Sequence, residues 1–175
     1  MKNKVFVNKK DKFHFYLFTL TIFISGLSYS TLAYISVVFK SNGFSPAQMG
    51  NVFFIIIIPL LIITPFSGKL SIKFGALNIT IIGMLITFIS FLSFHFTQYN
   101  YYYCIISRMV QGLGSGLYFS ASIIYAKSKL NDKSDVFYIG IFASMIPLSF
   151  IAGPALGEWY FKSFSSKYYF LILSI

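Results

Sequence analysis

Charged residues are scarce in this chain, and acidic ones are the scarcest. Only 10% of the 175 residues are charged, and just four are Asp or Glu. A soluble domain carries roughly a quarter charged residues, so this chain has too few to cover a globule with a wetted surface. The shortage excludes an ordinary soluble domain and indicates apolar surroundings, as in a lipid bilayer.

Cysteine and clustered reactive side chains are lacking as well. Cys104, the single cysteine, lies in an apolar run, which excludes an intramolecular disulfide and indicates a small buried side chain. The sequence has no metal-ligand spacing, no cluster of His, Asp and Glu, and no nucleophile constellation. The glycine-rich segment 112–116 lacks the preceding strand of a nucleotide site. We therefore expect no enzyme, no cofactor and no bound metal.

The chain is nevertheless strongly basic, with a formal net charge of +10. Its lysines lie in short segments between long apolar runs rather than in a patch among soluble elements. This distribution argues against nucleic acid as a partner. It is typical of loops on the cytoplasmic side of a membrane.

Long apolar runs dominate the sequence. They lie near residues 13–39, 47–66, 77–97, 100–126, 136–157 and 168–175. A spanning helix needs about 20 mostly apolar residues, so we expect an all-α membrane bundle with five complete helices and the start of a sixth. The first run is too long for a secretory signal and is expected to remain as a tilted helix. The last run reaches only ~12 Å of a ~30 Å core, which predicts that the chain is a fragment.

Local sequence marks two helix boundaries. Ser45, Pro46 and Gln48 offer an N-cap, a proline at the first helical position and a capping-box partner, so the second helix should begin there. Residues 131–135 form a polar turn before the fifth helix, with Ser134 as a candidate N-cap.

Lysine positions predict the orientation in the membrane. With the N-terminus inside, ten lysines fall in cytoplasmic segments and three in outer segments. The inside set is Lys2, Lys4, Lys9, Lys10, Lys12, Lys69, Lys73, Lys127, Lys129 and Lys133, and the outside set is Lys40, Lys162 and Lys167. The positive-inside bias therefore predicts a cytoplasmic N-terminus.

The single arginine, Arg108, lies within the fourth helix as part of a motif. Arg108, Gln111 and Gly112 are spaced i, i+3, i+4 and share one face. Gly112 and Gly116 allow close approach of another helix. A charged residue about two turns into a membrane helix is costly and normally faces the bundle interior. It marks a pathway or coupling element, or it holds neighbouring helices through their carbonyls.

Two more segments have a regular pattern of small residues. In the fifth helix the pattern comprises Gly140, Ser149, Gly153, Pro154 and Gly157. Proline removes a backbone donor there and bends the helix. The loop expected between the second and third helices contains Gly68, Leu70, Lys73 and Gly75. Alone, that loop is typical of a tight turn.

Together, the three motifs resemble those of the N-terminal half of the major facilitator superfamily. Each lies on the expected helix and in the expected order, and the resemblance covers essentially the whole chain. The fifth-helix pattern is similar to that of exporters that exchange substrate for protons. The chain departs from the superfamily at Ile72, where the loop signature has an acid, and at Ala76 and Leu77, which replace a basic pair. Ser149 and Glu158 stand where the exporter pattern has glycines; Ser is a small substitute, and Glu is not.

The resemblance implies a twelve-helix transporter made of two six-helix halves, with a substrate cavity between them. Residues 1–12 would be a basic cytoplasmic tail and residues 13–175 the N-terminal half-bundle. The missing C-terminal half, the lipid bilayer, a small-molecule substrate and protons would be the partners. The resemblance also implies that Arg108 is linked to proton coupling, and that the fifth-helix kink seals the half-bundle against leak.

Other candidate site residues are few. Glu158, near the outer end of the fifth helix, is the one acid placed to titrate near the membrane, unless it is simply exposed at the interface. Ser25 and Tyr34, in the polar first helix, line the cavity or serve in helix packing. The remaining acids lie in cytoplasmic segments, so a proton carrier deep in the membrane would come from the missing half.

The sequence therefore predicts a secondary transporter, an exporter of a drug-like or metabolite molecule driven by proton exchange. The alternative is a non-transporting membrane remnant or interaction module, which an immediate stop after Ile175 in the gene would support. Lysine in place of arginine, with many Ile, Phe and Asn residues, is typical of an AT-rich bacterial genome and hence of a bacterial cell membrane.

Cysteine labelling in intact cells tests the orientation, with Cys104 replaced. A cysteine introduced at position 42 should react with an impermeant reagent, because 41–43 is expected outside. One at position 131 should react only after permeabilisation, because 127–133 is expected inside. Labelling at 131 but not at 42 would reverse the assignment.

Overall fold

The computed structural model describes residues 6, 9–30, 35–97, 99–130 and 135–163, and these form helices joined by short connections. The helices are α1 (Lys9–Ser30), α2 (Ile35–Ser41), α3 (Pro46–Phe54), α4 (Ile57–Phe74), α5 (Ala76–Thr97), α6 (Tyr101–Lys127) and α7 (Asp135–Ser163). Within the described residues, the other regular pairing is one antiparallel bridge between Phe6 and Leu130. The all-α class expected from the apolar runs is confirmed.

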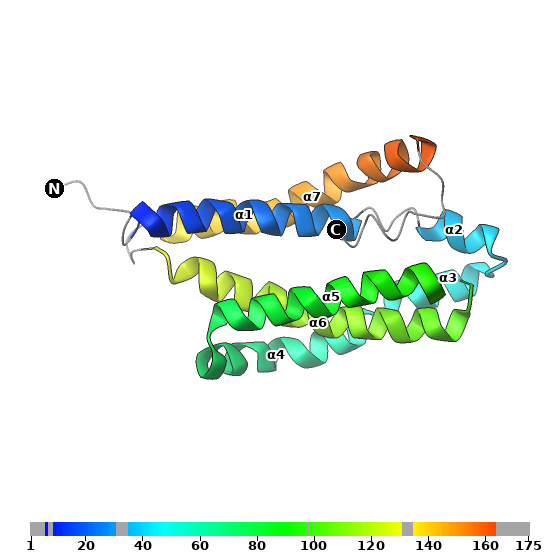
Figure 1. Ribbon diagram of the computed structural model, residues 1–175, viewed down its shortest axis with the longest axis horizontal. Coiled ribbons are helices and arrows are strands. Elements are labelled where there is room, and N and C mark those ends of the chain that lie inside the picture. The colour runs from blue at the N-terminus through cyan, green and yellow to red at the C-terminus, as the bar shows by residue number, and fades with distance from the viewer. Residues whose placement is uncertain (1–5, 7–8, 31–34, 98, 131–134, 164–175) are drawn as a thin grey trace.

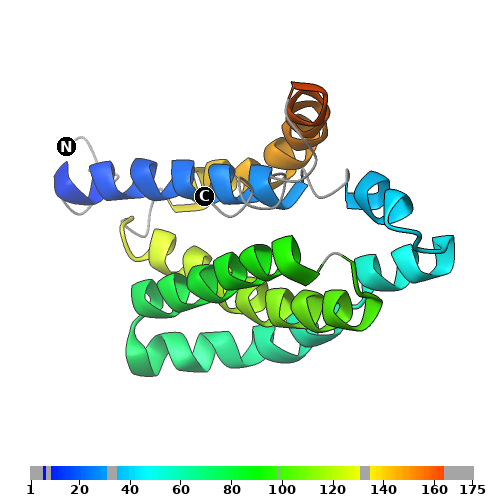
Figure 2. The same cartoon turned by 45° about the vertical axis from the view of Figure 1, so that its right-hand side comes forward.

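The helices pack in two layers (Figure 1). α1 and α7 lie side by side in one layer, and α4, α5 and α6 form the other. The short helices α2 and α3 connect the layers at one end, as the turned view in Figure 2 also shows. α6 packs chiefly against α4 and α5 and also touches α1, α3 and α7, which makes it the central helix.

Apolar side chains cover the outside of this bundle. Leu61 and Ile62 of α4 are 65% and 60% exposed, and Ile151 of α7 is 76% exposed, whereas Gln111 and Ser115 of α6 are fully buried. A soluble protein shows the opposite distribution. An outer surface of this kind fits hydrocarbon, where backbone polar groups must be satisfied within helices.

Four stretches are long and apolar enough to cross a membrane: Lys9–Ser30, Pro46–Phe74, Ala76–Phe96 and Val136–Trp159. The central helix α6 is not among them, although it has 27 residues. Its buried positions are largely small or polar, because neighbouring helices rather than lipid surround them.

Local chemistry explains several helix ends. Ser45 caps α3 in a complete capping box with Gln48, as the sequence predicts, and Pro46 occupies the first helical position. Asn100 caps α6 by accepting hydrogen bonds from the backbone N–H groups of Tyr102 and Tyr103. Gly75, with φ of 88°, makes the sharp turn from α4 to α5.

The second membrane stretch is interrupted where the sequence analysis expected one helix. α3 ends at Phe54 and α4 begins at Ile57. Pro59 explains the break, because it has no N–H for the carbonyl of Ile55 and its ring would clash with that carbonyl. Restarting the helix at Ile57 puts the proline in a first turn, where a backbone N–H has no helical partner anyway.

Several expected bounds differ from those observed. The first helix begins at Lys9 rather than near residue 13, and ends at Ser30, with α2 following from Ile35. α4 continues to Phe74, eight residues past the expected end near 66. α7 continues to Ser163 rather than ending near 157. Ser134 and the sixth run, 168–175, lie outside the described residues.

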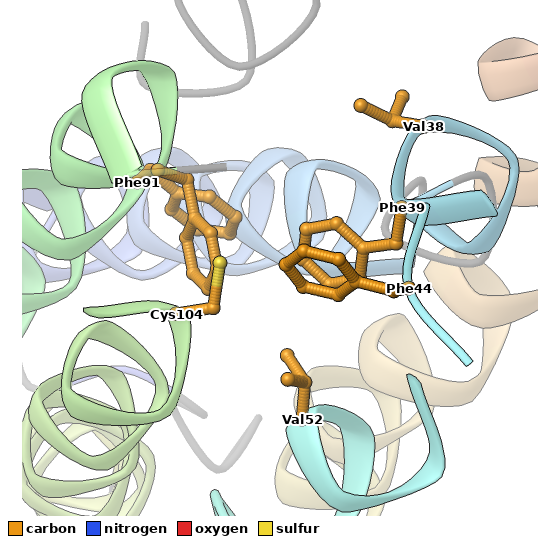
Figure 3. Close-up of a cluster of buried hydrophobic side chains, with 7 residues drawn as sticks. Val38, Phe39, Phe44, Val52, Phe91 and Cys104 are labelled. Carbon is orange, nitrogen blue, oxygen red and sulfur yellow. The ribbon is translucent and has the colours of Figure 1, made fainter. Parts of the chain in front are cut away.

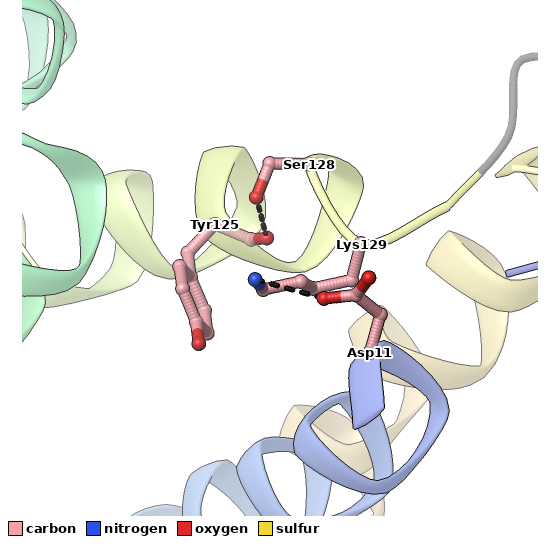
Figure 4. A network of polar contacts seen from close by, with 4 residues as sticks. All are labelled: Asp11, Tyr125, Ser128 and Lys129. Carbon is pink, nitrogen blue, oxygen red and sulfur yellow. Dashed lines mark hydrogen bonds and ion pairs between the residues drawn. The ribbon is translucent and has the colours of Figure 1, made fainter. Parts of the chain in front are cut away.

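The two layers are also joined at the end where the chain begins (Figure 4). A carboxylate oxygen of Asp11, in the first turn of α1, lies 3.0 Å from the ammonium nitrogen of Lys129, just after α6. That ammonium group also lies 5.2 Å from the ring centroid of Tyr125. Phe6 packs on Tyr138 of α7, with 5.1 Å between ring centroids. We call this cluster of Phe6, Asp11, Tyr125, Lys129 and Tyr138 the clasp.

The Asp11–Lys129 pair should contribute measurably to stability, because its side chains are only 13% and 22% exposed. Asp11→Asn should cost about 1 kcal/mol and lower the melting temperature in detergent by about 2–4 °C. Lys162→Gln is the matched control, since its pair with Glu158 is exposed. Equal melting temperatures for wild type and Asp11→Asn would show that the clasp does not depend on its ion pair.

Candidate functional site

The deepest charge in the structure is Arg108, which is 3% exposed. Its Nε donates a hydrogen bond to the carbonyl of Val52 at 3.1 Å, and its Nη1 donates to Oε1 of Gln111. The guanidinium carbon lies 5.8 Å from the ring centroid of Phe53 and 5.9 Å from that of Phe94. Arg108 is thus held by one carbonyl, one amide and two aromatic faces.

The break between α3 and α4 supplies the carbonyl. Val52 lies in the last turn of α3, where carbonyl groups lack helical partners. Among the described residues, the hydrogen bonds of Arg108 go to a carbonyl of α3 and to a side chain of α6 itself.

No carboxylate neutralises Arg108 among the described residues. Asp11 pairs with Lys129, and Glu158 pairs with Lys162 at 2.6 Å near the far end of α7. A buried cation without an anion costs several kcal/mol before its hydrogen bonds are counted. Such a buried cation would be strongly stabilised by any negative charge that comes near it.

Gln111 shares the face of Arg108, as its i+3 spacing predicts, and is fully buried. Its Oε1 accepts from Arg108, but its Nε2 has no hydrogen-bond partner among the described residues. An unpaired buried amide costs about 1–3 kcal/mol. Two buried hydrogen-bond donors, a charged guanidinium and a neutral amide, therefore lie next to each other.

A cluster of buried apolar side chains, drawn in Figure 3, adjoins Arg108 through Val52 and Phe94. It comprises Val38, Phe39, Phe44, Val52, Phe91, Phe94 and Cys104. Phe39 and Phe44, on either side of the turn after α2, stack at 4.8 Å. Cys104 is fully buried one turn before Arg108, as expected for the lone cysteine. Phe94 is part of this cluster and also contacts the Arg108 guanidinium, so the cluster lies directly beside the arginine site.

The α6 glycines permit backbone contact on two sides. A Cβ at Gly112 would lie 2.7 Å from the ring of Pro59 and nearer still to the carbonyl of Ile56. One at Gly116 would lie 2.9 Å from the carbonyl of Leu60, also in α4. On the other side, a Cβ at Gly114 would lie 2.7 Å from the carbonyl of Gly83 in α5. These distances are below van der Waals contact, so only glycine fits.

The interface between α1 and α7, which we call the seam, is also built from small residues in close contact, and it includes serine hydroxyls. Gly26 packs against Ser149, and Gly153 packs against Ser30. Ser30 Oγ donates a hydrogen bond to the carbonyl of Ser149 at 2.8 Å. Sequence reasoning singled out Ser149 and Gly153 but missed Gly26 and Gly83. The four-residue spacing of Gly26 and Ser30 was the available signal for the seam.

The remaining motif residues differ in their surroundings. Gly157 is buried in α7 and Pro154 is partly buried there, whereas Gly140 faces open space. Glu158 is exposed and pairs with Lys162. The segment expected to be a loop is helical as far as Phe74, because α4 continues through Gly68 and Lys73, and only Gly75 forms the turn. Ser25 is partly buried in α1, and Tyr34 lies outside the described residues.

Comparison with known proteins agrees with this arrangement. The family model described as Major Facilitator Superfamily matches residues 18–175, which includes the arginine site and both glycine seams. This chain belongs to the major facilitator superfamily. A curated relative, the multidrug efflux pump SdrM of Staphylococcus aureus (strain N315), is 30% identical over 142 residues. The alignment covers 79% of this chain and 31% of the relative, so this chain spans about a third of the length of SdrM.

Close backbone contact at Gly112 predicts a large effect of substitution. Gly112→Leu should lower the yield of inserted, monodisperse protein and its melting temperature, because overpacking costs about 1–3 kcal/mol or more. Gly140→Leu is the matched control, since no atom lies within 4 Å of the added Cβ. Normal yield and melting temperature for Gly112→Leu would show that α4 and α6 can separate without cost.

Proposed function

We propose that this chain forms the N-terminal half-bundle of a secondary transporter that exports small molecules in exchange for protons. The observation that carries the proposal is the buried Arg108, held with Gln111 in the central helix without a carboxylate partner among the described residues. A protein that only needed stability would gain by replacing such a cation with an apolar side chain. The presence of such a cation in the buried core favours a role in coupling.

The coupling mechanism follows from electrostatics. A fixed positive charge in a medium of low dielectric constant favours the ionised form of any acid nearby. The described chain offers no acid deep in the bundle, so a second half-bundle would supply it. Loss of a proton from that acid would be stabilised by Arg108, and binding of a proton would weaken the contact and let the halves separate. Glu158, exposed near the end of α7, is a second and more peripheral candidate.

The direction and substrate class come from the relative and from the motifs. SdrM is described as a multidrug efflux pump, which supports export of a drug-like, amphipathic molecule or a metabolite. Ser25 of α1 and Tyr34 would contact such a substrate. The glycine and hydroxyl seam between α1 and α7 would let these helices stay together while the halves rock around the site.

Charge placement supports a cytoplasmic N-terminus in a bacterial cell membrane. The start of α1, the turn between α4 and α5, and the end of α6 lie at one end of the bundle (Figure 1), and most lysines of the described chain are found there. Lys40 and Lys162 belong to helices that reach the opposite end. The positive-inside bias then places the lysine-rich end in the cytoplasm.

Arg108 substitutions test the function in the whole gene product. Arg108→Lys keeps the charge but loses the planar fork of donors that reaches Val52 and Gln111 together, so proton-driven transport per inserted molecule should fall by about tenfold or more. Arg108→Ala should abolish it. The measurement is efflux of a fluorescent drug from proteoliposomes with an imposed pH gradient, normalised to inserted protein.

Lys40→Ala provides the matched control, because it removes one positive charge from an exposed position on α2. It should transport at the wild-type rate. If Arg108→Ala lost yield while each inserted molecule still transported normally, the arginine would be a packing residue and the coupling proposal would end.

A further inference from the structure

A groove crosses the outer surface of α4, α5 and α6 near their lysine-rich ends. Leu70 and Phe74 of α4, Ile79 and Ile82 of α5, and Leu117 of α6 line it. Its volume is about 620 Å³, which lies in the range of ligand pockets, ~300–1,000 Å³. The groove lies between helices that pack through backbone contacts at Gly83, Gly114 and Gly116, and is therefore built into the bundle.

The lining of this groove is almost entirely apolar and offers a ligand few hydrogen-bonding groups. Asn78 is the one polar side chain in it, and its Nδ2 already donates to the carbonyl of Phe74 at 2.9 Å. Within a bilayer, an apolar groove open to the side is filled by hydrocarbon rather than by water. An acyl chain fits this lining better than a substrate that needs several polar contacts.

Two lysines of α4 lie beside the groove. Lys69 and Lys73 lie in the last two turns of α4 and are exposed, and the Lys73 ammonium group lies 5.1 Å from the ring centroid of Phe74, which lines the groove. α4, α5 and α6 contain no Asp or Glu along their whole length. Lys69 and Lys73, next in sequence to the lining residues Leu70 and Phe74, therefore place positive charge beside the groove that no acid of these three helices offsets.

A second groove gives an internal comparison. It has a volume of about 610 Å³ and lies at the other end of the same layer, where Ile57, Ile58, Tyr101 and Tyr102 help to line it. α3, the adjoining start of α4 and the first turns of α6 contain no lysine. The two grooves, which have nearly equal volumes, thus differ in the charge of the residues beside them.

From this juxtaposition we propose that the lysine-rich groove binds one anionic phospholipid, with an acyl chain along Leu70, Ile82 and Leu117 and the phosphate at Lys69 and Lys73. Basic sites beside membrane helices on the cytoplasmic side attract anionic headgroups in this way. The lipid would cover the outer side of α4 and α6 opposite the arginine site. The inference stands apart from the transport function, since it depends only on the groove and its lysines.

Native mass spectrometry of the delipidated whole gene product tests the site. Phosphatidylglycerol and phosphatidylcholine with identical acyl chains are added separately. One phosphatidylglycerol should be retained at activation energies that remove phosphatidylcholine. The double variant Lys69→Gln/Lys73→Gln should weaken that retention by about 25-fold in apparent affinity, since each lysine near the surface contributes about fivefold.

The control double variant Lys9→Gln/Lys10→Gln removes the same charge from exposed positions at the same end, and should retain the lipid as wild type does. Ile82→Trp, which fills the groove, should also weaken retention, whereas Ile58→Trp in the second groove should not. Equal retention of the two lipids by wild type, or equal loss in both lysine variants, would overturn the site in favour of general surface charge. If Ile82→Trp does not fold, the lysine pair alone decides, because both side chains are exposed.

Discussion

Backbone contact along α6 is the constraint on which the rest of this structure depends. Gly112 and Gly116 bring the α4 backbone against α6, and Gly114 does the same for α5 through Gly83. The contact at Gly112 falls on Ile56, in the break between α3 and α4. That contact places the carbonyl of Val52 within reach of Arg108, one turn earlier on α6. The glycines therefore set the position of the arginine's partner as well as the helix spacing.

The buried arginine gives the packed layer its chemical asymmetry. Its charge is met by dipoles and aromatic faces rather than by a carboxylate of the described chain, and the neighbouring Gln111 amide has a donor to spare. Preorganised donors of this kind stabilise negative charge wherever it comes within reach. A seam of glycines and serines between α1 and α7 brings those two helices into close contact and adds the hydrogen bond from Ser30 to Ser149.

The outer surface of the bundle differs in polarity from one region to the next. Apolar side chains cover it between two ends that differ in charge, and the lysine-rich end includes the turn at Gly75. Since α4 to α6 carry no acid, Lys69 and Lys73 at that end are not neutralised by a carboxylate of these three helices. The proposed orientation and the proposed lipid site both depend on the lysines at that end.

The sequence by itself determined the all-α class, the start of α3 at its capping box, the extent of α5 and α6 to within a residue, and the shared face of Arg108 and Gln111. These features depend on local chemistry and on helical periodicity, which are properties of short segments. The break before Pro59 was also readable from the sequence, since proline acts on the carbonyl four residues earlier, and it was missed.

Only the tertiary structure decided which helix meets which. In a bilayer, an apolar side chain is equally stable against lipid and against a neighbouring helix, so hydrophobic periodicity does not distinguish a packed face from an outer one. The pairing of Gly83 with Gly114, the hydrogen bond from Ser30 to Ser149 and the choice of Val52 to hold Arg108 each join residues far apart in the chain. Their contacts depend on how whole helices fit together, and no short segment contains that information.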